Sequence, residues 1–160
     1  MKRRTADSAV KKSPAPMLTP LHFKEVFQTT GYHRIQLIKH GVAASTIMQL
    51  AKSLRIDPNH LIATLGLPKT TVARKILRQQ YLSIAHAERV IGLAKMIGQV
   101  EVMMNACEVK NFDVPQWLGS WLYSPHPALG DRQPEEFMDT YTGQEMVSTL
   151  LFQMQSSAFA

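Results

Sequence analysis

Six cationic and hydroxyl-bearing side chains lie within ten consecutive residues near the middle of the chain. They are Lys69, Thr70, Thr71, Arg74, Lys75 and Arg78. Hydroxyl and guanidinium groups can bond the edges of DNA bases, while cationic side chains can hold phosphates. We expect Thr70, Thr71 and Arg74 to reach bases. Lys69, Lys75 and Arg78 would hold phosphates.

These side chains need a rigid element, and the surrounding residues predict a helix-turn-helix. Asp57-Pro58 is a helix-start signal, because aspartate caps free N–H groups and proline suits a first turn. The first helix, Asn59–Leu65, would end at Gly66, and the second would run over Lys69–Gln80. In this motif the second helix enters the major groove, with its N-terminal residues facing base edges.

The second helix of this segment is predicted to be amphipathic. Arg74 and Arg78 are four residues apart and therefore share a face. We expect Val72, Ile76 and Leu77 on the opposite, buried face. A basic surface helix in any other helical bundle would carry the same charges, so that alternative stays open.

Apolar residues elsewhere recur at helical rather than strand spacing, and no internal repeat is found. The predicted fold class is all-α, with a helix-turn-helix bundle followed by a smaller helical domain. Besides the helix-turn-helix, helices are expected over residues 21–30, 32–40, 42–54, 83–106, 116–123, 134–139 and from 142 onward.

The longest expected helix begins at a Ser83 cap and ends near Ala106. Its inner face would carry Ile84, Ala87, Val90, Ile91, Ala94 and Ile97. Met96, Val100, Met103 and Met104 lie beyond that stripe. Because major-groove readers usually bind paired half-sites, this excess suggests a homodimer. Burial under the C-terminal helices is the alternative explanation.

The C-terminal elements have recognisable starts. Asp113 can cap a helix whose apolar stripe includes Trp117 and Trp121. Ser124-Pro125-His126-Pro127 predicts a rigid extended break. Thr142 and Glu145 stand three apart, as in a capping box at the start of the last helix.

Charge divides the chain into two unlike parts. Residues 1–100 hold sixteen Lys or Arg against four Asp or Glu, whereas residues 101–160 hold two against eight. A basic segment binds nucleic acid by neutralising phosphates and releasing their counterions. The acidic part would repel that polymer and is free to bind something else, so a chain with two functions is indicated.

Catalytic and metal-binding patterns are absent from the sequence. The six histidines are dispersed, the single Cys107 leaves no cysteine pair for zinc, and no Gly-rich phosphate loop occurs. Glu135 and Glu136 are adjacent, so on a helix they diverge by about 100° and make a poor acid–base pair. We expect Cys107 to be a buried structural thiol. The prediction is a non-enzyme with no cofactor, metal or small-molecule substrate.

The chain lacks targeting signals that we recognise. No apolar run approaches the roughly 20 residues needed to cross a membrane. The first nineteen residues are basic without an apolar core, which predicts a flexible cationic arm rather than a secretory signal. One cysteine fits a reducing compartment, so a cytoplasmic location without membrane contact is expected.

The C-terminal residues resemble the toxin-binding domain of the Xre/MbcA/ParS antitoxin family. The shared features are Trp117-Leu118, the turn Ser-Pro-His-Pro-Ala-Leu-Gly over 124–130, Pro134, Gly143 and the small-aromatic-small terminus 157–160. Upstream, Leu82-Ser83, Ala87-Glu88-Arg89 and Leu93-Ala94 look like the segment that joins this domain to an Xre-type helix-turn-helix. His126 stands where asparagine is commoner in the family.

This resemblance implies a type II antitoxin encoded beside a RES-domain toxin that degrades NAD or uses it for ADP-ribosylation. The C-terminal end would block the toxin's active site, and the helix-turn-helix would repress the shared operator. The expected domains are an arm over 1–19, a DNA-binding and dimerisation domain over 20–106 and a toxin-binding domain over 107–160. The residues expected to contact the toxin are Phe152, Gln155, Ser156, Ser157, Phe159 and Ala160.

One further reading of the sequence remains open. An ordinary helix-turn-helix regulator could carry an acidic C-terminal domain that senses a small molecule or only dimerises. A convergent polar pocket in the C-terminal half would favour that alternative, whereas a neighbouring RES-type reading frame would favour the antitoxin.

Overall fold

The computed structural model describes residues 22–158, with side chains up to residue 156. Within that range the fold is all-α, as predicted, and the only β pairing is two isolated bridges. The expected arm over 1–19 lies outside the described residues. The elements are α1 (Phe23–Gln28), α2 (Gly31–His40), α3 (Thr46–Leu54), α4 (Pro58–Thr64), α5 (Lys69–Leu77), α6 (Ile84–Ala106), α7 (Val114–Leu122), the 3-10 helices η1 (Pro127–Leu129) and η2 (Pro134–Phe137), and α8 (Tyr141–Ala158).

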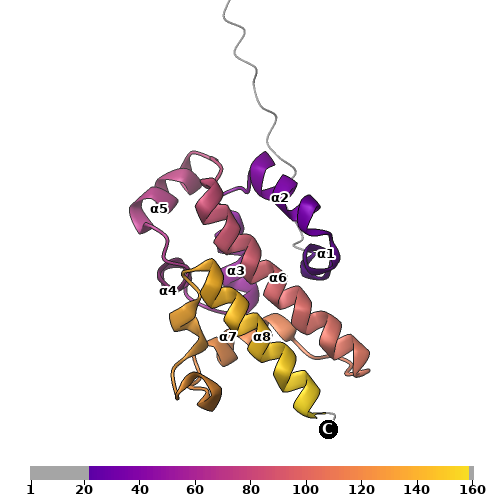
Figure 1. Cartoon of the computed structure of the whole chain (residues 1–160). Coiled ribbons are helices and arrows are strands. Elements are labelled where there is room, and N and C mark those ends of the chain that lie inside the picture. The colour runs from indigo at the N-terminus through magenta and orange to yellow at the C-terminus, as the bar shows by residue number, and fades with distance from the viewer. Residues whose placement is uncertain (1–21, 159–160) are drawn as a thin grey trace, which may run out of the picture.

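The long helix α6 runs through the middle of the molecule, and α1, α2, α3, α7 and α8 all pack against it (Figure 1). The approach of α1 is very close at Gly98, where any side chain would collide with the Phe23 carbonyl. A second close approach joins α7 to α3, because a side chain at Gly119 would collide with the Leu54 carbonyl. Within residues 22–156 the buried side chains of both halves form one continuous core.

Three helix starts follow the predicted caps. The Asp57 carboxylate accepts the N–H groups of Asn59 and His60, at 2.9 and 3.1 Å. The Ser83 hydroxyl accepts the His86 N–H at 3.3 Å. The Asp113 carboxylate accepts the Gln116 N–H at 3.0 Å. Each cap is a contact between residues at most three apart, which is why the sequence alone could predict it.

The predicted cap of the last helix was wrong. Thr140, not Thr142, accepts the Gly143 N–H, at 3.0 Å, and the helix begins at Tyr141. Gly143 lies so close to the Phe137 carbonyl that a side chain would not fit there. Glu145 does not complete a capping box with Thr142. Its carboxylate pairs with the Lys95 ammonium at 3.2 Å.

The predicted extended break holds up to His126, whose backbone is extended, and the chain folds again from Pro127. Pro127 begins η1, the His126 ring Nδ1 accepts the Ala128 N–H at 3.2 Å, and Gly130 closes the turn with φ +65°. His126 also forms a bridge with Arg132. The helix expected over 134–139 is the shorter 3-10 turn η2.

Two predictions about buried faces need correction. Ile84 is exposed, because it is the first residue of α6 and lies before the turns that meet the core. The residues predicted to be in excess on α6 are covered within the chain: Met96, Val100 and Met103 are buried and Met104 is half-buried. Burial under neighbouring helices therefore accounts for most of this excess.

Candidate functional sites

The turn between α4 and α5 is rigidly supported. Gly66 takes φ +60°, a conformation that glycine adopts without strain. The Arg89 guanidinium on α6 donates to the Leu65 and Gly66 carbonyls, at 3.2 and 2.9 Å. A side chain at Gly66 would approach Asp139 to within 2.9 Å. The turn is thus fixed against α6 and against the C-terminal half, which holds α5 in a defined orientation.

The structure places all six predicted DNA-contacting residues on α5 or at its C-cap. Val72 is fully buried, so it anchors the inner face of the helix. Lys69, Thr70, Arg74 and Arg78 are exposed, whereas Thr71 and Lys75 are half-buried. This surface, residues 69–78 of α5 and its C-cap, is called the α5 surface below.

Leu77 contradicts the predicted inner face of α5, because it is 85% exposed. Five residues at about 100° each turn it roughly 140° from Val72, so it projects on the side of the arginines. The helix also ends at Leu77 rather than at Gln80. Gln79 takes a left-handed φ of 52°, and Tyr81 then forms a bridge with Ala43. This pairing joins residues far apart in the chain, and the local sequence does not reveal it.

Lys75 is held by the segment that follows α5. Its ammonium donates to the Tyr81 carbonyl at 2.8 Å, which leaves its other two protons for a phosphate. His86 was not predicted as part of this site. Its ring Nδ1 is buried without a hydrogen-bond partner among the described residues. Burial, with Arg89 and Lys75 nearby, lowers the pKa of His86 below 6.5, because each of these disfavours its charged form.

At its far end, α8 exposes part of the predicted toxin-contacting set. Phe152 is 61% exposed, Ser156 is exposed and Gln155 is half-buried. Phe152 and Gln155 border a shallow groove of about 360 Å³ between α1, α6 and α8. Phe159 and Ala160 lie outside the described residues, as does the side chain of Ser157.

A row of aromatic rings extends from Trp117, which lines a pocket with Met154 and Gln155 of α8. Successive ring centroids of Phe112, Trp117, Trp121 and His126 are 6.1, 6.0 and 6.0 Å apart. Phe112 is exposed, and the other three are half-buried. Cys107 is half-buried nearby, and its thiol donates to the Met103 carbonyl at 3.1 Å, which fits the predicted structural role only in part.

A polar cluster joins α4 to the C-terminal half. The Glu135 carboxylate lies 3.2 Å from the His60 Nε2 and accepts the Thr64 hydroxyl at 3.0 Å. The Tyr123 hydroxyl is 3.1 Å from the Thr64 hydroxyl. Burial raises the pKa of Tyr123, the Thr64 bond opposes this shift, and the Glu135 charge adds to it. These partners are too far apart in sequence for any local pattern to have found them.

No group of three or more His, Cys, Asp or Glu among the described side chains could hold a metal ion. Over residues 22–158, no helix combines the length and apolarity that a membrane crossing requires.

Comparison with known proteins gives two domain matches and a full-length relative. Residues 33–95 match the antitoxin Xre-like helix-turn-helix domain. Residues 112–156 match the antitoxin Xre/MbcA/ParS C-terminal toxin-binding domain. The chain is also 39% identical to the Prs ADP-ribosylating antitoxin of Sphingobium sp. (strain YBL2) over 155 residues, which cover 96% of this chain and 98% of that protein.

Proposed function

The chain belongs to the Xre/MbcA/ParS antitoxin family, and we propose that it blocks a cognate RES-domain toxin and represses its own operon in the cytoplasm. As an antitoxin with a helix-turn-helix domain it is a regulatory protein and not an enzyme.

The proposed toxin uses NAD. The Sphingobium relative is named for ADP-ribosylation, a reaction that takes its ADP-ribose from NAD. A cleft that holds this anionic dinucleotide needs cationic donors and an apolar slot for its rings. An antitoxin that fills the cleft should therefore carry acceptors, negative charge and an aromatic or aliphatic side chain.

The end of α8 supplies the acceptors and the aromatic side chain of that description. Phe152 offers an exposed ring, and Gln155 and Ser156 offer acceptor oxygens one turn later. We propose that Ser157, Phe159 and Ala160 extend the same contact into the active site. The net negative charge of residues 101–160 favours approach to a cationic cleft.

The α5 surface is the proposed operator reader. Thr70, Thr71 and Arg74 would contact base edges, because they lie on the first turns of the second helix of the motif. Lys69, Lys75 and Arg78 would hold phosphates. Operators read by such motifs usually contain paired half-sites, so we propose that a homodimer binds DNA.

The observation that carries this proposal is the position of the two surfaces at opposite ends of α6 (Figure 1). The α5 surface lies near the start of α6, and the end of α8 lies against its last turns. A helix of 23 residues is about 34 Å long. One chain can therefore hold DNA at one end while its other end enters a toxin.

The test is a pair of variants measured in two assays. Deletion of residues 156–160 should abolish rescue of cells expressing the cognate toxin and leave operator binding intact. Arg74→Ala should weaken operator binding and leave rescue of these cells intact. Equal rescue by the full-length and truncated proteins at matched levels would overturn the proposed blocking element. Loss of both activities in one folded variant would overturn the separation of the two ends.

A further inference from the structure

The last turn of α2 lies beside the end of α5, although α3 and α4 separate the two helices in the chain. Ala43, just after α2, forms a bridge with Tyr81, just after α5. The Leu82 N–H donates to the Val42 carbonyl at 2.8 Å, next to this bridge. A side chain at Gly41, the C-cap of α2, would come within 2.9 Å of the Tyr81 ring. These contacts fix the end of α2 against the segment that follows the α5 surface.

That end of α2 carries two exposed basic side chains, Lys39 and His40, which are called the α2 tip below. The His40 Nδ1 is 2.7 Å from the Gln36 carbonyl oxygen. Because a carbonyl only accepts, this nitrogen must carry a proton and donate. Among the described residues, the His40 Nε2 and the Lys39 ammonium have no hydrogen-bond or ion-pair partner. Both can therefore bind a group from outside the chain.

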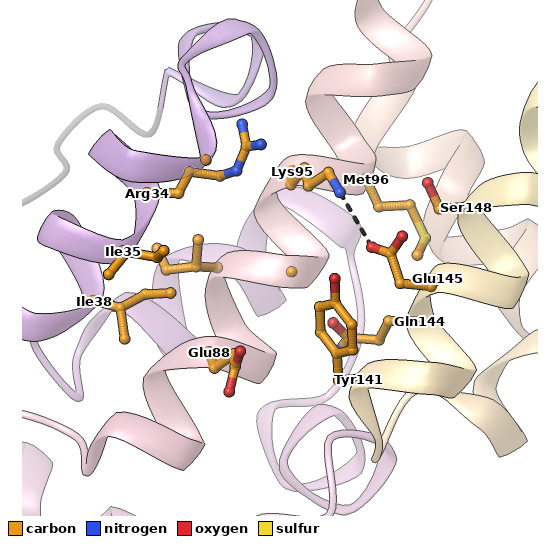
Figure 2. Close-up of a pocket in the computed structure, with 13 residues that line it drawn as sticks. Arg34, Ile35, Ile38, Glu88, Lys95, Met96, Tyr141, Gln144, Glu145 and Ser148 are labelled. Atoms are coloured by element: carbon orange, nitrogen blue, oxygen red, sulfur yellow. Dashed lines mark hydrogen bonds and ion pairs between the residues drawn. The ribbon is translucent and has the colours of Figure 1, made fainter.

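Other cations near α2 are already engaged within the chain. The Arg34 guanidinium, earlier on the same helix, donates to three carbonyls at the end of α1. Beyond the side of α2, the Lys95 ammonium pairs with the Glu145 carboxylate at 3.2 Å (Figure 2). Arg89 holds the turn between α4 and α5. The α2 tip has no comparable role in holding the fold together.

No carboxylate lies close to the α2 tip in the sequence. Residues 26–56 and 58–87 include α2, α3, α5 and the two loops that meet at the bridge, and they contain no Asp or Glu. The same two ranges hold eight Lys or Arg. A surface of this composition attracts a polyanion, because bound phosphates replace counterions that the polyanion then releases. DNA bound to the neighbouring α5 surface would bring phosphates to this place.

We propose that the α2 tip binds backbone phosphates of the operator outside the stretch that α5 reads. The inference rests on the proposed repressor function and extends its DNA surface beyond the two helices of the motif. Lys75 and Arg78 would hold phosphates beside the groove, and Lys39 and His40 would hold neighbouring ones. Because phosphates carry no base identity, these contacts would add affinity and fix the orientation of the protein without adding sequence preference.

The helix dipole also favours cations in the last turn of a helix, and that effect requires no DNA. Lys52 provides the matched control, because it is likewise an exposed lysine in the last turn of a helix, α3. The end of α3 faces the C-terminal half, since Arg55, its C-cap, pairs with Asp113 at 3.4 Å. Removal of Lys52 thus loses the same dipole interaction away from the proposed DNA surface.

The experiment measures binding of the full chain to its own promoter and to a random duplex of equal length, by fluorescence anisotropy at several salt concentrations. Lys39→Ala should weaken binding to both duplexes by the same factor, roughly 3–10-fold, and reduce the slope of log affinity against log salt by about one unit. The double variant Lys39→Ala, His40→Ala should lose at least as much. Lys52→Ala should keep the wild-type slope, and far-UV circular dichroism should be the same for all variants.

Three results would overturn the proposal. One is a Lys39→Ala protein with the wild-type slope. Another is an equal loss of slope in Lys39→Ala and Lys52→Ala, which would assign the effect to overall charge. The third is a loss confined to the promoter, which would make Lys39 a base reader.

The random duplex separates this proposal from the repressor function. A wild type without preference for its promoter contradicts the repressor, whereas the difference in slope between Lys39→Ala and Lys52→Ala still decides the role of the α2 tip. Conversely, a wild type that prefers its promoter and a Lys39→Ala protein with an unchanged slope would leave the repressor standing and exclude the α2 tip from the DNA surface.

Discussion

Thr64 on α4 donates a hydrogen bond of 3.0 Å to the Glu135 carboxylate on η2, although the two residues are 71 positions apart. Because the single Thr64 proton is used in this bond, the Tyr123 hydroxyl must donate to Thr64, at 3.1 Å. The first helix of the helix-turn-helix is thereby bonded to two elements of the C-terminal half.

Thr64→Val should destabilise the folded chain. The change keeps the side-chain shape but removes the donor to Glu135 and the acceptor for Tyr123, and Thr64 is buried. Leaving such partners unsatisfied should cost about 1–3 kcal/mol of unfolding free energy. Urea denaturation measures this. Thr149→Val, which removes an exposed hydroxyl from α8, is the control and should change stability by less than about 0.5 kcal/mol. Equal effects of both variants would contradict the prediction.

Acidification should destabilise the protein partly through His86. Its pKa is lowered in the folded chain, so the unfolded chain binds the proton more readily. Its contribution is therefore constant well above pH 6.5 and unfavourable as the pH falls through 6.5 toward the lowered value. The measurement is the difference in unfolding free energy between wild type and His86→Gln across this range. The wild type should lose stability relative to the variant on acidification, and a difference independent of pH would refute this.

Arg74→Ala should weaken operator binding by about 1–3 kcal/mol and relax the preference at one position of the half-site, because a base contact carries sequence information. Lys69→Ala should weaken all duplexes alike and reduce the slope of log affinity against log salt by about one unit. Fluorescence anisotropy with operator and random duplexes at several salt concentrations separates the two effects. If the wild-type protein binds operator and random duplexes with equal affinity, the proposed repressor function is wrong.

Phe152→Ala should weaken binding of the cognate toxin by about 2 kcal/mol or more, since aromatic anchors dominate protein interfaces. Met146→Ala, which truncates another exposed apolar side chain on α8, is the matched control and should have little effect. Titration calorimetry with an inactive form of the toxin gives both values. If Met146→Ala weakens binding more than Phe152→Ala, the contact lies nearer the start of α8.

Features that depend on neighbours in the sequence were predictable. The caps at Asp57, Ser83 and Asp113 involve residues at most three apart, so they follow from residue type alone. The six residues of the α5 surface lie within one short segment, so their proximity was certain once the helix was recognised.

Features set by distant contacts were not predictable. The bridge between Ala43 and Tyr81 follows the early end of α5, and no local pattern predicts it. The exposure of α2 was not predictable either. Its apolar residues have the spacing of a buried helix, but no element among the described residues covers that side of the helix. Periodicity predicts that a helix has an apolar face but not what covers it.

The close approach of Gly119 to the Leu54 carbonyl restricts how this chain could be recombined. The family models match a helix-turn-helix domain at 33–95 and a toxin-binding domain at 112–156. This division suggests chimeras in which one domain is taken from a relative. The two parts nevertheless share buried surface on α3, α6 and α7. A chimera joined between α6 and α7 would put a foreign helix against Leu54 and succeed only if that helix also has a glycine there. If the proposed function holds, new pairings of operator and toxin are reached more easily by changing exposed residues at the two ends than by exchanging whole segments.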